Sequence, residues 1–82
     1  MPHYYLHIRH NGDVIEDPEG FDLPDLSEAQ VEALIGLRQI LAEAVKNGAE
    51  PTADAILIVD ETGQELASVP LHEALPTKLR KY

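Results

Sequence analysis

The sequence of 82 residues contains no cysteine and no tryptophan, and it has no long apolar run. Without thiols, disulfide bonds and cysteine-ligated metal sites are excluded, which fits a reducing compartment. The longest aliphatic stretch, AILIV at 55–59, is far shorter than the about 20 residues that a helix needs to span a bilayer. The first residues also do not follow the basic and then apolar pattern of a secretory signal. We therefore expect a cytoplasmic protein with no membrane partner.

Basic residues are scarce over most of the chain. Residues 11–76 hold all fifteen acidic residues and two basic ones, Arg38 and Lys46, so this part carries a net charge of −13. Such a surface repels phosphate, and we expect no nucleic-acid binding by the folded part. The last six residues, TKLRKY, instead carry three positive charges. We predict a single domain at 1–76 followed by a flexible basic tail at 77–82.

Patterns typical of catalysis are missing as well. None of the serine or threonine hydroxyls has a histidine at a spacing typical of a nucleophile and its base. The sequence also lacks a glycine-rich phosphate loop. We therefore expect no catalytic residues, no cofactor and no enzyme activity.

Residues 3–9, HYYLHIR, alternate between apolar and polar side chains, as does a strand with one buried face. An Asn-Gly pair follows at 11–12, and it favours a two-residue hairpin turn because both residues must adopt positive φ. This turn sets the register and places Ile8 opposite Ile15. We expect these two side chains to share the buried face.

Three of the four histidines lie in this first hairpin. His3 and His7 are four residues apart on one face of a strand, which separates their Cα atoms by about 13 Å, whereas a zinc ligand lies about 2 Å from its ion. His10 points to the other side, and His72 has no second histidine at a metal-binding spacing. We expect no metal site, and we place His7 on the solvated face, opposite Glu16.

The segment 17–26, DPEGFDLPDL, has the prolines and glycine of a loop, and a long helix follows it. We predict that Ser27 caps this helix in a capping box with Gln30 and that Gly48 ends it. A helical projection gives one apolar stripe for the sheet, made of Ala33, Leu34, Leu37, Ile40, Leu41, Ala44 and Val45. Val31, Ile35 and Ala42 widen the apolar arc beyond what the sheet requires.

Residues 55–71, AILIVDETGQELASVPL, indicate a second hairpin around a turn at DETG, with Gly63 in the left-handed position. A three-residue loop pairs Ile58 with Leu66 and places both under the helix. Ala67 then lies on the opposite face of the sheet. We also expect one short helical turn at LHEAL, before the tail.

The opposite face of the predicted sheet also carries apolar side chains. Leu57 and Val59 share it with Tyr5, and this face stays open to water unless a partner covers it. We predict an α+β fold of ββαββ order, with a four-stranded, mainly antiparallel sheet and the long helix packed on one face.

Four segments carry a resemblance to a known family: MPHYYLHIRHNG, DPEGFDLPDLSEA, the EAL of the helix and DETGQELASVPL. Together they resemble an uncharacterised family of short bacterial proteins that is common in alphaproteobacteria. The resemblance covers nearly the whole chain and implies no activity and no catalytic residues. The tail LPTKLRKY lies beyond the family's pattern.

These observations favour an interaction protein. We predict a small, acidic, homodimeric protein-binding module without catalytic activity. The alternative is an inhibitor or antitoxin-like protein whose acidic surface imitates nucleic acid and binds a basic protein partner. The residues that we predict to form the interaction surfaces are Tyr5, His7, Leu57, Val59, Val31 and Ile35.

Overall fold

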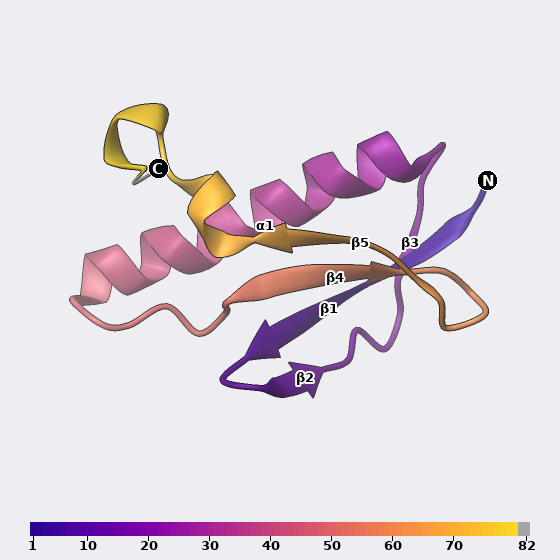
Figure 1. The fold of residues 1–82 in the computed structure, drawn as a ribbon, viewed down its shortest axis with the longest axis horizontal. Coiled ribbons are helices and arrows are strands. Elements are labelled where there is room, and N and C mark those ends of the chain that lie inside the picture. The colour runs from indigo at the N-terminus through magenta and orange to yellow at the C-terminus, as the bar shows by residue number, and fades with distance from the viewer. Residues whose placement is uncertain (81–82) are drawn as a thin grey trace.

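A computed structural model of the chain describes residues 1–80 and confirms the α+β fold (Figure 1). The strands pair in the order β2-β1-β4-β5, all antiparallel, and a short β3 pairs with the beginning of β1. The long helix α1 packs on one face of this sheet. The elements are β1 (His3–His10), β2 (Asp13–Ile15), β3 (Phe21–Asp22), α1 (Leu26–Asn47), β4 (Ala55–Val59), β5 (Glu65–Pro70) and the 3₁₀ helices η1 (Leu71–Ala74) and η2 (Thr77–Leu79).

The first hairpin has the predicted turn and register. Asn11 and Gly12 have φ angles of 53° and 86°, as a type I′ turn requires. Ile8 pairs with Ile15, so both side chains lie on the helix side of the sheet. The prediction that both are buried is wrong for Ile15, which is 56% exposed, because α1 does not extend over β2.

Helix α1 begins two residues earlier than predicted. Asp25 is its N-cap, and the Asp25 carboxylate accepts a hydrogen bond of 2.9 Å from the backbone N–H of Glu28. The prediction of Ser27 as the cap is therefore wrong, because the Asp25 carboxylate offers the same kind of acceptor two residues earlier. The helix ends as predicted at Gly48, which adopts φ 63°.

The core between α1 and the sheet combines Leu37 and small residues of the helix with large residues of the strands. Ala29 and Ala33 are fully buried against a cluster that includes Ile56 and Ile58 of β4. Small side chains at these positions let the helix approach the sheet closely. The prediction of Val45 in the core stripe is wrong: it is 73% exposed, at the edge of the stripe that faces away from the sheet.

The second hairpin differs from its predicted register by one residue. Ile58 pairs with Ala67, and the register shifts between Ile58 and Val59. Ala67 therefore packs against the core, while Leu66 is exposed, which reverses the predicted faces of these two residues. The cause is the Asp60 carboxylate, which accepts hydrogen bonds from the backbone N–H groups of Thr62 and Gln64 and so lengthens the loop.

The C-terminal segment forms the predicted short turn, η1, and η1 packs against α1. Part of the predicted flexible tail is attached to η1, because the Arg80 guanidinium donates hydrogen bonds of 2.7 Å and 3.0 Å to the carbonyl oxygens of Glu73 and Leu75. The remainder of that tail, residues 81–82, lies outside the described residues. Within residues 1–80, no helix has both the length and the apolar character needed to cross a membrane.

Candidate functional site

The helix-side face of the sheet is only partly covered. Helix α1 packs against β4, β5 and η1, and it makes few contacts with β1. The helix-facing side chains of the β1–β2 hairpin therefore line an open groove beside α1. Its volume is about 900 Å³, within the range of ligand and peptide pockets.

The floor of the groove is apolar. Leu6 and Ile8 of β1 line it, together with Ile15 of β2 and Phe21 of β3. Ile15 is 56% exposed and Phe21 is 41% exposed, so both present large apolar side chains to water. Ile40 of α1 completes the opposite wall. A contiguous apolar surface of this kind is typical of binding sites.

The rim of the groove is acidic. Five carboxylate side chains line it, and no lysine or arginine is among its lining residues in the described part of the chain. These residues come from the loop after β2, from α1 and from the segment after α1. The five are Glu16, Asp17, Glu32, Glu43 and Glu50.

Asp17 fixes the loop that forms one end of the groove. Its carboxylate accepts hydrogen bonds from the backbone N–H groups of Leu6, Glu19 and Gly20, at 3.2, 3.1 and 3.0 Å. Partial burial raises the pKa of Asp17, but the hydrogen bonds from Gly20, Leu6 and Glu19 outweigh this effect and hold the pKa below its ordinary value. The carboxylate therefore stays charged and ties this loop to β1.

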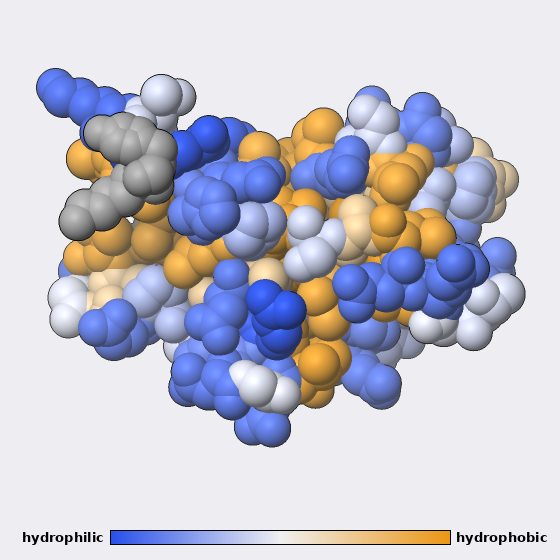
Figure 2. Space-filling view, viewed as in Figure 1, coloured by the Kyte–Doolittle hydropathy of each residue, from blue (hydrophilic) through white to orange (hydrophobic). Residues whose placement is uncertain are grey.

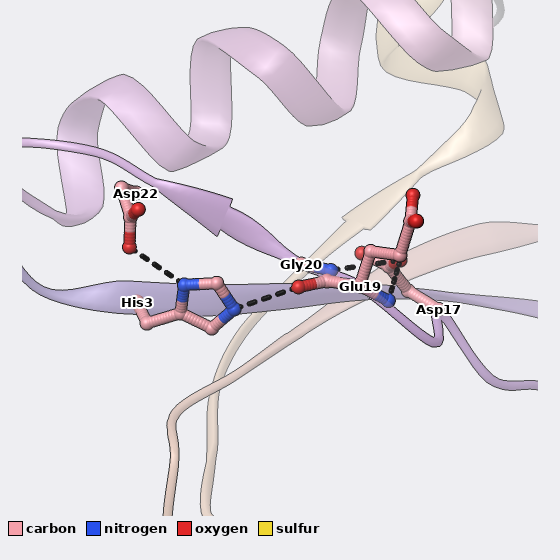
Figure 3. Close-up of polar contacts among 5 residues, drawn as sticks. All are labelled: His3, Asp17, Glu19, Gly20 and Asp22. Atoms are coloured by element: carbon pink, nitrogen blue, oxygen red, sulfur yellow. Dashed lines mark hydrogen bonds and ion pairs between the residues drawn. The ribbon is translucent and has the colours of Figure 1, made fainter.

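His3 holds the other end of the same loop (Figure 3). Its Nδ1 lies 2.7 Å from the Asp22 carboxylate, and its Nε2 lies 2.8 Å from the carbonyl oxygen of Glu19. Both partners are acceptors, so the doubly protonated imidazolium satisfies them both. The hydrogen bond with Asp22 and then the one with Glu19 raise the pKa of His3.

Gly20 lies against the His3 ring. A Cβ on Gly20 would come within 2.5 Å of His3 Nε2 and 2.8 Å of the Tyr4 carbonyl oxygen, and its φ is 74°. Only glycine fits this position without strain. His3 and Gly20 therefore act together to close the loop on β1.

His7 also forms a hydrogen bond with the loop after β2. Its Nδ1 accepts a 3.0 Å hydrogen bond from the backbone N–H of Asp17, whereas the expected partner was the neighbouring Glu16. The His7 ring stacks on Tyr5, and Tyr5 makes an edge contact with His3. Two of the histidines of the first hairpin thus position the loop that borders the groove.

The structure brings four of the predicted interaction residues together on the face of the sheet opposite α1. Tyr5 pairs with Val59, and His7 pairs with Leu57. Leu57 and Val59 are only 9% and 8% exposed, because β4 has a neighbouring strand on each side. This face was expected to be open to water, yet its two aliphatic residues are covered within one chain. Figure 2 shows apolar and polar side chains interspersed over one face of the molecule.

The other two predicted residues, Val31 and Ile35, lie on α1 and are exposed as expected. Ile35 also lines the groove, whereas Val31 borders a small hollow near the start of the helix. They are separate from the residues on the opposite face of the sheet.

Sequence reasoning missed the groove and its floor. The sequence pattern places Ile15 on the buried face and Phe21 in a loop, so it predicts neither as a binding residue. The length of the second strand could have indicated the groove. The β2 segment before Pro18 is too short to extend the sheet under a helix of 22 residues. Among the residues that the structure describes, no group of three or more His, Asp or Glu side chains could hold a metal ion.

Fold and site together define a small α+β domain with an open antiparallel sheet and one covering helix. Its groove has an apolar floor and an acidic rim. The chain belongs to the family described as a domain of unknown function (DUF6894), whose match covers residues 3–72. The match includes every strand and α1, and it ends before η2. No curated protein and no solved structure matches the chain.

Proposed function

We propose that this chain is a protein-binding module without catalytic activity, and that its groove takes an amphipathic segment of a partner with apolar and basic side chains. The observation that carries the proposal is that five carboxylate residues line the same groove as an apolar floor. An amphipathic helix that lies in an apolar groove is a common mode of peptide recognition. The absence of cysteine supports a place for this function in the cytoplasm.

The two parts of the groove have different roles in such binding. Burial of Ile15 and Phe21 supplies affinity, at about 25 cal/mol for each Å² of apolar surface removed from water. The rim carboxylates select for basic partners and speed their approach, because complementary charge acts mainly on association rate and specificity. These exposed charges act over about 8 to 10 Å at moderate salt, so added salt weakens their contribution.

An inhibitor that imitates nucleic acid is the second interpretation of the acidic surface. It also requires a basic partner, but it relies on carboxylates alone and leaves the apolar floor unused. The exposed Ile15 and Phe21, which line the groove together with the carboxylates, favour recognition of an amphipathic segment. Substitution of the floor separates the two functions, since it affects only the first.

The test is an NMR titration of the ¹⁵N-labelled chain with a designed helical peptide of about 15 residues. The peptide carries leucine at positions i, i+3, i+4 and i+7 and lysine on its flanks, and a second peptide carries glutamate in place of lysine. We expect amide shifts to change at the groove, around Ile8, Ile15 and Gly36, with the lysine peptide only. Shifts confined to β5, or equal binding of both peptides, would contradict the proposal.

Variants then separate floor from rim. Ile15→Ser and the pair Glu16→Gln with Glu50→Gln are each expected to weaken binding of the lysine peptide about tenfold. Matched controls are Val14→Ser, which changes the exposed neighbour on the opposite face, and Glu61→Gln with Glu65→Gln, which remove the same charge outside the groove. A floor variant that binds normally while the rim variant does not would favour the inhibitor interpretation.

A further inference from the structure

The side of α1 that faces away from the sheet carries a second apolar surface. Val31, Ile35, Ala42 and Val45 are exposed there. With Arg38 they follow one another at spacings of four, three, four and three residues. Side chains at these spacings form one row along a helix, and this is the repeat of paired helices. We call these five residues the outer row.

Charge along this side of α1 is divided between its two ends. Glu28 lies in the first turn, Arg38 in the middle and Lys46 in the last turn. In a parallel pair of such helices Glu28 and Lys46 would each meet their own copies, and like charges would repel. In an antiparallel pair the acidic end of one helix meets the basic end of the other, and the two helix dipoles also oppose each other favourably.

We propose that a second copy of this chain docks on the outer row, with the two α1 helices antiparallel about a twofold axis. The alternating repeat then sets the contacts. Val31 packs beside the partner's Ala42, and Ile35 packs beside the aliphatic stem of the partner's Arg38. Glu28 lies near the partner's Lys46, and symmetry makes each of these contacts twice.

The size of this surface sets the expected strength. The segment from Glu28 to Lys46 is about 27 Å long, and a single pair of helices buries less than a standard protein interface. We therefore expect a dissociation constant between about 1 and 100 μM. This surface differs from the floor and rim of the groove except at Ile35, which borders both. The dimer can therefore fail without affecting the proposed binding function, and the reverse also holds.

Sedimentation equilibrium of the full chain from about 5 to 500 μM tests the dimer directly. We expect Val31→Glu and Val45→Glu each to weaken association at least tenfold, and both positions are exposed, so the fold should persist. Val14→Glu is the matched control, because it introduces the same charge at an exposed valine of β2. A wild-type chain that stays monomeric throughout, or a dimer that survives both variants, overturns the proposal.

Charge reversal tests the antiparallel arrangement. Glu28→Lys and Lys46→Glu each turn two attractive contacts into repulsive ones, and we expect each to weaken the dimer about tenfold at low salt. The double variant restores opposite charges and is expected to recover wild-type association. Glu61→Lys and Lys78→Glu are the controls for net charge. A double variant that associates no better than either single one refutes antiparallel pairing.

Discussion

Replacement of the partly buried Asp17 by asparagine should destabilise the chain. The Asp17 carboxylate accepts three backbone hydrogen bonds, from Leu6, Glu19 and Gly20. Asparagine keeps one acceptor oxygen, and its NH₂ group then faces at least one of these N–H donors. Hydrogen bonds to a charged group contribute about 1.5 to 3 kcal/mol each when they are buried. Because Asp17 is only partly buried, we expect a total loss of about 2 kcal/mol.

For a domain of this size, about 2 kcal/mol lowers Tm by about 10 °C. Urea unfolding followed by circular dichroism measures the change in free energy at neutral pH. Asp13→Asn is the control, because Asp13 is exposed on β2, and we expect it to change stability by less than about 0.5 kcal/mol. If both variants unfold at the same urea concentration, Asp17 does not hold the loop as described.

The pH dependence gives a second readout of the same contacts. Because the pKa of Asp17 in the folded chain lies below its ordinary value of 3.8, its charge stabilises the fold above that value. The contribution is lost as the pH falls through the folded pKa. We therefore expect the difference between wild type and Asp17→Asn to be constant above about pH 5 and to shrink at lower pH. A difference that grows in acid would contradict the assigned sign.

Two further outcomes follow from the contacts of His3 and Asp25. The NMR titration midpoint of His3 should lie above its ordinary value of 6.5, and Asp22→Asn should lower it; the stabilisation from this pair is present at low pH and is lost as the pH rises through the folded pKa. An unchanged midpoint in the variant would show that Asp22 is not the cause. Asp25→Ala should cost about 1 kcal/mol by loss of the cap, and Ser27→Ala should cost much less. The reverse order, measured by thermal unfolding, would restore Ser27 as the cap.

Local sequence patterns were sufficient for the long helix, for four of the strands and for one register, but not for β3, which lies in the segment 17–26 that was predicted as a loop. The Asn-Gly turn depends on two residues alone, and its hairpin therefore has the predicted pairs. The second hairpin has the wrong predicted register because Asp60 accepts hydrogen bonds across the turn and adds a bulge. Such a side chain can make several different contacts. The contact that it makes depends on the geometry of the loop, which cannot be derived from the amino-acid sequence alone.

The candidate site could be predicted only in part. The acidic character of its rim is evident from composition, and the exposure of Val31 and Ile35 on α1 is as predicted. The groove itself arises because α1 lies over β4 and β5 and leaves Ile8 only partly buried and Ile15 exposed. The lateral position of a helix on a sheet depends on packing of residues such as Ala29 and Ala33, which are distant in sequence from the strands they contact.

The pairing of β1 with β4 has a consequence for the order in which the chain folds. Tyr5 pairs with Val59, so the central contact of the sheet joins residues 54 positions apart. The first hairpin can form early, but it gains its neighbour only after α1 and β4 exist, and contacts of such long sequence separation slow folding. During synthesis the apolar side of the hairpin therefore stays exposed to water while the 44 residues from 16 to 59 emerge, at roughly 5 to 20 residues per second. The short, exposed β2 limits the strand edge that is free to aggregate during those seconds.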